Sequence, residues 1–154
     1  MQDSNVVQDL EATERFHALH RIVHADRIGI IGHCMGGRTA FLGAGVMNSI
    51  KAAVVLYGGH IFKTEGQGMP APIELTKNIG CPVLGLYGDK DHIVGLEEIR
   101  RLTAELASKG VMHEFHIYEN AGHAFQDFTR PDHYDRQASD DAWARLLAFL
   151  KKTL

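Results

Sequence analysis

The 154-residue sequence contains no apolar run near the roughly 20 residues that a helix needs to cross a bilayer. It also lacks a basic stripe, and its formal net charge of −3 argues against nucleic acid as the main partner. The polar start MQDSN has no signal-peptide character, so we expect a cytoplasmic protein without a membrane partner. The remaining composition is ordinary for one globular domain over residues 1–154, with 45% hydrophobic and 23% charged residues.

Cysteine is scarce, and the two cysteines, Cys34 and Cys81, do not form the C-x-x-C pair of thiol redox proteins. A reducing compartment and their different settings favour free thiols over a disulfide. Cys81 precedes Pro82 and fits a core position, whereas Cys34 lies among glycines. A redox function is therefore the weakest of the interpretations that the sequence allows.

Metal-binding patterns are also poor, although the chain has ten histidines. His20 and His24 have the i, i+4 spacing of helical ligands, but no acidic or cysteine partner stands at a fitting spacing. His113 and His116 are three residues apart in a predicted strand and should point to opposite faces. We therefore expect neither a metal nor a cofactor, and a solvated histidine face on the first helix.

Four short segments predict strands, the first three of them apolar, and each is followed by turn residues. They cover residues 28–31, 52–58, 82–88 and 112–118. Because helical patterns lie between them, crossover connections and a parallel, right-handed α/β sheet of about four strands flanked by helices are expected. Ligands gather at the carboxyl ends of such strands, so the chemistry should lie there.

The helical segments are marked by apolar residues at helical spacing. The first should be capped near residues 3–5 and carries its apolar face on Ala12, Phe16, Leu19 and Val23. The others cover residues 36–47, 96–106 and 142–150, and Gly110 can end the third. Residues 59–81, with repeated Gly and Pro, predict a long irregular loop that holds at most a short helix at about residues 73–77.

The first predicted strand runs into G-x-C-x-G at residues 32–36. This pattern is the nucleophile elbow with sulfur in place of the usual serine oxygen. The helix that follows brings its N-terminal N–H groups beside Cys34, and the Met35 N–H can bind an oxyanion. The alternative is a buried cysteine in a tight turn, because short glycine patterns also arise by chance.

Two further strand ends offer partners for a nucleophile. YGDKDHIV follows the third strand, and either Asp89 or Asp91 could orient a histidine or cap a turn. ENAGHAF follows the fourth strand and places His123 in a small-residue loop, with His60 as the rival base. Nucleophile, acid and histidine in that order are typical of α/β-hydrolases, which predicts a Cys-Asp-His triad with Cys34 as nucleophile.

GHCMGG, GDKDHIV and AGHAF resemble the three motifs of the dienelactone hydrolase (carboxymethylenebutenolidase) family, and the C-terminal segment RPDHYDRQASDDAWARLLAFLKKTL resembles its tail. The resemblance implies an α/β-hydrolase fold and metal-free hydrolysis of small esters or lactones. It assigns the nucleophile to Cys34, the base to His123 and the orienting acid to Asp91 rather than Asp89. The expected enzyme therefore forms a thioester intermediate on a small ester or lactone substrate.

The chain differs from that family at its N-terminus, because family members begin with several strands before the helix at which this chain starts. Those strands provide the second oxyanion N–H, a glutamate near the thiol and an arginine for the substrate carboxylate. A second family arginine falls on Asp127 here, with Arg130 further along. We therefore expect a truncated α/β-hydrolase fold, and the alternative is a non-catalytic fragment or binding module that retains the triad residues.

Without those N-terminal strands, the strand at residues 28–31 would have an open edge. Exposed edges of this kind pair with other chains, so we expect a homodimer or a higher homo-oligomer. Ile61 and Phe62 in the long loop, with His33 beside the nucleophile, are candidates for the substrate pocket. Ile61 and Phe62 could equally cover the core, and His33 could only fill the elbow.

Overall fold

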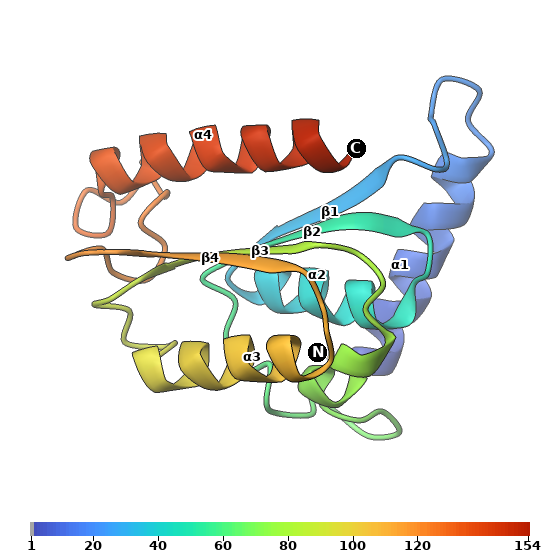
Figure 1. The fold of residues 1–154 in the computed structure, drawn as a ribbon, viewed down its shortest axis with the longest axis horizontal. Coiled ribbons are helices and arrows are strands. Elements are labelled where there is room, and N and C mark those ends of the chain that lie inside the picture. Colours follow the sequence, from blue (N-terminus) through green and yellow to red (C-terminus); the bar gives the residue numbers. More distant parts are fainter. Residues whose placement is uncertain (1) are drawn as a thin grey trace.

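A computed structural model describes residues 2–154 and shows strands alternating with helices (Figure 1). The strands are β1 (Ile28–His33), β2 (Ile50–Leu56), β3 (Val83–Gly88) and β4 (His113–Tyr118). The helices are α1 (Asp3–Ala18), α2 (Met35–Val46), α3 (Leu96–Ser108) and α4 (Arg136–Thr153), with a short 3-10 helix, η1 (Pro72–Asn78). All four predicted strands are present, and no helix among residues 2–154 is long and apolar enough to cross a membrane.

The four strands form one parallel sheet in the order β1-β2-β3-β4. Helix α4 lies over one face of the sheet, and α2 and α3 lie over the other (Figure 1). The central strands are almost wholly buried: every residue of β3 is buried, and only Lys51 of β2 is exposed. Burial on both faces explains why these strands are continuous apolar runs, and the predicted parallel α/β sheet is confirmed.

The predicted first helix forms, but its expected apolar face is on the surface. It ends at Ala18, and Phe16 and Leu19 are 67% and 88% exposed. Its N-cap is Gln2, which makes no side-chain capping bond, so none of the three predicted caps acts as one. The spacing of the apolar residues therefore predicted the helix correctly, but the face that it buries was predicted wrongly.

A buried arginine of α2 forms hydrogen bonds with the long loop after β2. Arg38 is 1% exposed, and its Nε and Nη2 atoms donate to the carbonyl oxygens of His60 and Lys63 at 3.1 and 2.8 Å. The same guanidinium pairs with both carboxylate oxygens of Asp3 at 2.5 and 2.9 Å. The Asp3 N–H in turn donates to the Glu65 carbonyl at 2.8 Å. The start of α1, the loop and α2 therefore form one unit.

Candidate active site

The loop between β1 and α2 holds Cys34 in an unusual backbone conformation. Its φ of 54° and ψ of −117° are unfavourable for a residue with a side chain. The turn is possible because Gly32 has no Cβ: a Cβ there would lie 1.8 Å from the Gly36 carbonyl oxygen. The Cys34 N–H still donates to the Leu56 carbonyl at 2.9 Å, so the strand pairing continues up to the turn. The elbow thus presents the thiol at the carboxyl end of the sheet.

Residues after three different strands converge on this thiol. The Nε2 atom of His123 lies 3.1 Å from Cys34 Sγ, and its Nδ1 atom lies 2.8 Å from Asp91 Oδ2. The other carboxylate oxygen of Asp91 accepts hydrogen bonds from the N–H groups of Ile93 and Val94 at 2.7 and 2.9 Å. The imidazole is therefore held between a fixed carboxylate and the sulfur.

The two rival residues lie elsewhere. Asp89 accepts a hydrogen bond from the Asn120 N–H at 2.7 Å and thus joins the turns that follow β3 and β4. His60 pairs with Glu65, with 3.3 Å between Nδ1 and Oε1, in the loop that Arg38 holds. Neither residue contacts the thiol, so Asp91 and His123 are the acid and the histidine that the structure brings to Cys34.

The contacts shift the protonation of both partners. Burial raises the pKa of Asp91, but the hydrogen bonds from His123, Val94 and Ile93 outweigh it, and the pKa lies below its ordinary value. The hydrogen bond to Asp91 is the main reason that the pKa of His123 is raised; burial opposes it, and the contact with Cys34 adds to the rise. Asp91 is thus ionised and stabilises the imidazolium form of His123.

A cavity of about 330 Å³ opens beside the sulfur. Its lining comes mainly from the elbow and from the loop between β4 and α4: His33, Cys34, Tyr57, Ala124, Gln126, Asp127, Phe128 and Arg130. Three of these residues have positive φ, namely Cys34 at 54°, Tyr57 at 39° and Ala124 at 62°. Strained backbone of this kind is concentrated at functional sites, and here it coincides with the cavity.

The predicted pocket residues are only partly at this cavity. His33 lines it, with its Nε2 atom 3.0 Å from Gln126 Oε1. Ile61 is 1% exposed within the core, and Phe62 lies beneath the Arg101 guanidinium, 4.3 Å from the ring centre. The prediction for Ile61 and Phe62 is corrected accordingly, because the loop that carries them turns inward, against α2 and α3.

Several cavity residues were missed from the sequence. Tyr57 directly follows β2, and its position at a strand end was the signal that could have found it. Gln126, Phe128 and the ion pair between Asp127 and Arg130 lie in an irregular loop, where no spacing rule applies. Met35, the predicted oxyanion donor, is the first residue of α2 and is 37% exposed.

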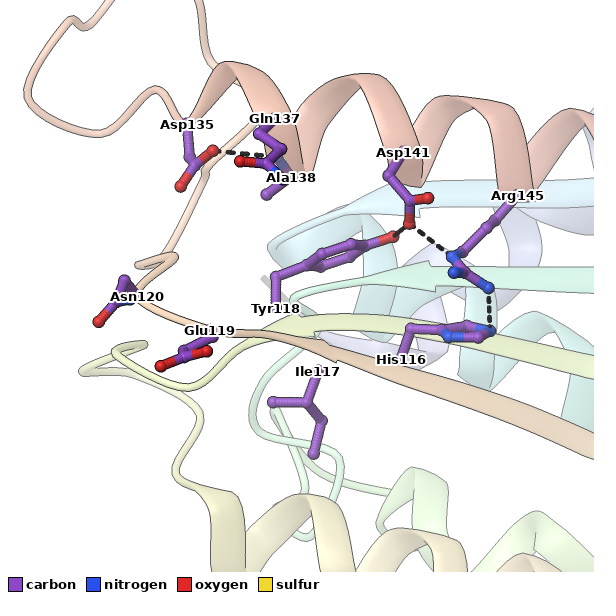
Figure 2. A pocket seen from close by; sticks show the side chains of 10 residues that line it. All are labelled: His116, Ile117, Tyr118, Glu119, Asn120, Asp135, Gln137, Ala138, Asp141 and Arg145. Carbon is purple, nitrogen blue, oxygen red and sulfur yellow. Dashed lines mark hydrogen bonds and ion pairs between the residues drawn. The ribbon is translucent and has the colours of Figure 1, made fainter.

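A larger polar cavity of about 510 Å³ lies between the end of β4 and α4 (Figure 2). Its side chains are paired with one another: the Tyr118 hydroxyl and Arg145 Nε both donate to Asp141 Oδ2, at 3.0 and 2.5 Å. Arg145 Nη1 also lies 3.2 Å from His116 Nε2. Neither Cys34 nor its partners line this cavity, so it is separate from the candidate site.

The two thiols differ in access, since Cys34 is exposed and Cys81 is buried, and both are free. Across residues 2–154, no group of three or more His, Cys, Asp or Glu side chains is arranged to hold a metal ion. The chemistry that the site offers is therefore that of a thiol, an imidazole and a carboxylate in hydrogen-bond contact.

Comparison with known proteins identifies the family of the chain. The sequence profile of the dienelactone hydrolase family matches residues 1–154. The carboxymethylenebutenolidase of Rhodococcus opacus is 32% identical over 158 residues, which covers 100% of this chain and 60% of that protein. The Bradyrhizobium sp. protein named "Probable 2-oxo-3-(5-oxofuran-2-ylidene)propanoate lactonase" is 32% identical over 152 residues, with 98% and 60% covered.

A solved structure shares the fold. The crystal structure of "Putative Dienelactone Hydrolase from Klebsiella pneumoniae subsp. pneumoniae MGH 78578" matches with a TM-score of 0.86 at 30% identity, covering 97% of this chain and 62% of that one. This likeness confirms the α/β-hydrolase fold expected from the sequence. The chain spans between 49% and 60% of the length of the curated relatives that it matches first. Because the family profile extends over the whole sequence, the chain belongs to the dienelactone hydrolase family.

Proposed function

We propose that this chain hydrolyses small carboxylic esters or lactones, with Cys34 as nucleophile, His123 as general base and Asp91 as the acid that orients it. The observation that carries the proposal is the continuous contact from Asp91 through His123 to Cys34 Sγ, at 2.8 and 3.1 Å. The Rhodococcus opacus relative, named a carboxymethylenebutenolidase, supports the lactone class. The modest cavity beside the sulfur, about 330 Å³, favours a small substrate.

Acyl transfer to the sulfur is the first half of the proposed reaction. His123 Nε2 takes the thiol proton, and the Cys34 thiolate attacks the carbonyl carbon. The negative charge that forms on the carbonyl oxygen accepts a hydrogen bond from the Met35 N–H at the start of α2. The ester C–O bond then breaks, the imidazolium gives its proton to the departing oxygen, and a thioester remains.

Hydrolysis of the thioester completes the cycle. His123 removes a proton from water, and the resulting hydroxide attacks the thioester carbonyl. The C–S bond breaks, the carboxylic acid leaves, and the Cys34 thiolate recovers the proton. Asp91 keeps Nδ1 protonated throughout, so that Nε2 faces the reacting atoms. A reducing compartment such as the cytoplasm suits a mechanism that needs a free thiol.

The sheet edge suggests how copies of the chain associate. Strand β1 pairs with β2 on one side only, and Ile31 is 44% exposed. An open edge with an apolar side chain favours pairing with another strand, which supports a homodimer or higher homo-oligomer. Within one chain, the Met35 N–H is the one oxyanion donor that we assign.

The test is hydrolysis of p-nitrophenyl acetate and butyrate by the purified protein, beside Cys34→Ala, His123→Ala and Cys81→Ala. We expect the first two variants to lose at least ~10³ in kcat/KM, since the nucleophile and base act as a unit. Cys81→Ala, which changes a buried thiol, should retain activity. Mass spectrometry of the acid-quenched protein should show one acyl group on the Cys34 peptide. A folded wild type without activity would favour the non-catalytic alternative.

A further inference from the structure

Tyr57 lines the cavity beside the nucleophile. It directly follows β2 and is 3% exposed, with a positive φ of 39°. Its ring meets the rings of His123 and Phe125 edge-on, at 5.3 and 5.2 Å between centres, and that of His33 at 5.7 Å. Rings on several sides and a strained backbone fix the direction of the side chain, which lies directly against the histidine of the triad.

The hydroxyl of Tyr57 has no partner among residues 2–154, unlike those of two other tyrosines. Tyr87 donates to the Gly58 carbonyl at 3.3 Å, and Tyr118 donates to Asp141. Within residues 2–154, Ser49 Oγ is the one buried side-chain oxygen or nitrogen that lacks a hydrogen bond, so the Tyr57 hydroxyl is open to the cavity. A hydroxyl in this setting is available to a polar atom of a bound molecule.

This hydroxyl stays protonated at every working pH. Burial is the main reason that the pKa of Tyr57 lies well above its ordinary value, and the nearby Cys34 and Asp127 raise it further, against a smaller opposing effect of Arg130. Tyr57 and Cys34 line the same cavity. Tyr57 is thus a neutral donor beside the reacting sulfur.

Other polar side chains of the cavity are already engaged. Arg130 Nε donates to Asp127 Oδ2 at 2.7 Å, and His33 Nε2 lies 3.0 Å from Gln126 Oε1. The Met35 N–H, at the start of α2, is assigned to the carbonyl oxygen in the mechanism above. Tyr57 contacts the His123 ring instead, and His123 is the group that protonates the departing oxygen.

We propose that Tyr57 is a catalytic residue whose hydroxyl donates a hydrogen bond to the departing alcohol oxygen of the ester. This inference rests on the hydrolase function proposed above and adds to it. When the tetrahedral intermediate collapses, the C–O bond breaks, its electron pair goes to the departing oxygen, and His123 supplies the proton. Tyr57 keeps its own proton and stabilises the charge that builds on that oxygen before the transfer is complete. The site is thereby suited to alkyl esters and lactones, whose alkoxide leaving groups need this help most.

The experiment compares two esters that share an acyl group but differ in the alcohol. Wild type and Tyr57→Phe are assayed with ethyl butyrate and p-nitrophenyl butyrate, and kcat/KM is measured because it reports the acylation half-reaction. We expect Tyr57→Phe to lose about 10²-fold on the ethyl ester, the usual effect of removing one preorganised donor, and less than about 3-fold on the p-nitrophenyl ester. The variant keeps the ring contacts and removes a hydroxyl without a protein partner, so its melting temperature should be unchanged. Tyr134→Phe, in the loop before α4, is the matched control and should leave both rates unaltered.

Each other result overturns the proposal. An equal loss on both esters would mean that the hydroxyl acts on packing or on a step common to both substrates. No loss on either ester, with an active wild type, would remove Tyr57 from the reaction and leave the hydrolase function standing. A wild type inactive on both esters would overturn the hydrolase function, and the role of Tyr57 with it.

Discussion

Asp3, in the first turn of α1, forms an ion pair with Arg38 of α2 in which both carboxylate oxygens take part, and both side chains are 1% exposed. Arg38 lies one turn after the nucleophile, and its N–H donates to the Cys34 carbonyl at 3.2 Å. The guanidinium also binds two carbonyls of the loop after β2. The first turn of α1 therefore contacts, through Arg38, the helical turn that follows the nucleophile.

Asp3→Asn should destabilise the fold strongly. The substitution leaves the Arg38 charge buried without its partner, and breaking a buried pair in this way costs about 3–5 kcal/mol. Urea denaturation followed by circular dichroism measures the change. Glu11→Gln is the control, because it breaks an exposed pair with Arg15 that is 3.8 Å long and should cost about 0–0.5 kcal/mol. Similar small losses in both variants would contradict the role of the buried pair.

The elbow glycines give a second matched pair of variants. A Cβ on Gly32 would lie 1.8 Å from the Gly36 carbonyl oxygen, whereas a Cβ on Gly36 meets nothing within 4 Å. Gly32→Ala must therefore move backbone and should lose more than about 3 kcal/mol, at the upper end of overpacking costs. Gly36→Ala lies in α2 and should be neutral or stabilising by up to about 1 kcal/mol. Thermal unfolding of both variants measures the two changes in stability. A Gly32→Ala variant as stable as the wild type would show that the turn can accommodate a Cβ at this position.

The triad predicts a pH dependence with a definite sign. His123 must be neutral to accept the thiol proton, so kcat/KM should rise with pH as the imidazole loses its proton. Because the bond to Asp91 raises the pKa of His123, this rise falls above the ordinary value of about 6.5. Asp91→Asn removes the main cause of the raised pKa, so the rise should move to lower pH, and the plateau should fall by about 10²–10⁴.

Asp89→Asn is the control for that profile. Asp89 bonds the Asn120 N–H and does not contact the histidine, so its replacement should leave the position of the rise unchanged. The measurement is kcat/KM for p-nitrophenyl butyrate between pH 5 and about 9, the range over which histidine and thiol groups titrate. If the pH profile is unchanged in Asp91→Asn, or shifts in Asp89→Asn, then the assignment of Asp91 as the orienting acid is wrong.

The sequence predicted the elements that local rules govern. The central strands β2 and β3 are buried and apolar, and all four strands end at turn residues, so the strands and the positions of Cys34, Asp91 and His123 at their ends could be found. Long-range pairing has no such signature. Nothing near Asp3 in the sequence indicates that Arg38, 35 residues away, will neutralise it. Much of the cavity wall comes from residues 124–130, an irregular loop in which no periodicity indicates where a side chain points.

Side-chain direction was the other limit. Glu97 lies in the first turn of α3 and pairs with Arg100 at 3.6 Å, although Arg101, at i+4, has the other common helical pairing distance. Arg101, one turn on from Glu97, lies instead over the Phe62 ring, and this contact removes Phe62 from the predicted pocket. Periodicity gives the face of a helix only to within a residue or so, and the packed neighbour decides between adjacent positions.

The open edge of β1 leads to the last prediction. Among residues 2–154, β1 has one hydrogen-bonded neighbour, β2, so its other edge can pair with another chain. Ile31 is 44% exposed on this strand, and α4, whose Leu150 reaches Gly29 of β1, leaves Trp143 52% exposed. We expect light scattering after size exclusion to give a mass above that of the 17.0 kDa monomer.

A charge on that strand should separate the copies. Ile31→Lys places an ammonium group where the apolar side chain would be buried, so the assembly should dissociate to monomers while the fold is retained. Met112→Lys is the control: this residue is 70% exposed just before β4, at the opposite edge of the sheet, and its replacement should leave the mass unchanged. A wild type that is monomeric at high micromolar concentration would contradict self-association through β1. A mass that falls equally in both variants would place the contact elsewhere, because Met112 lies beside β4, at the opposite edge of the sheet from Ile31.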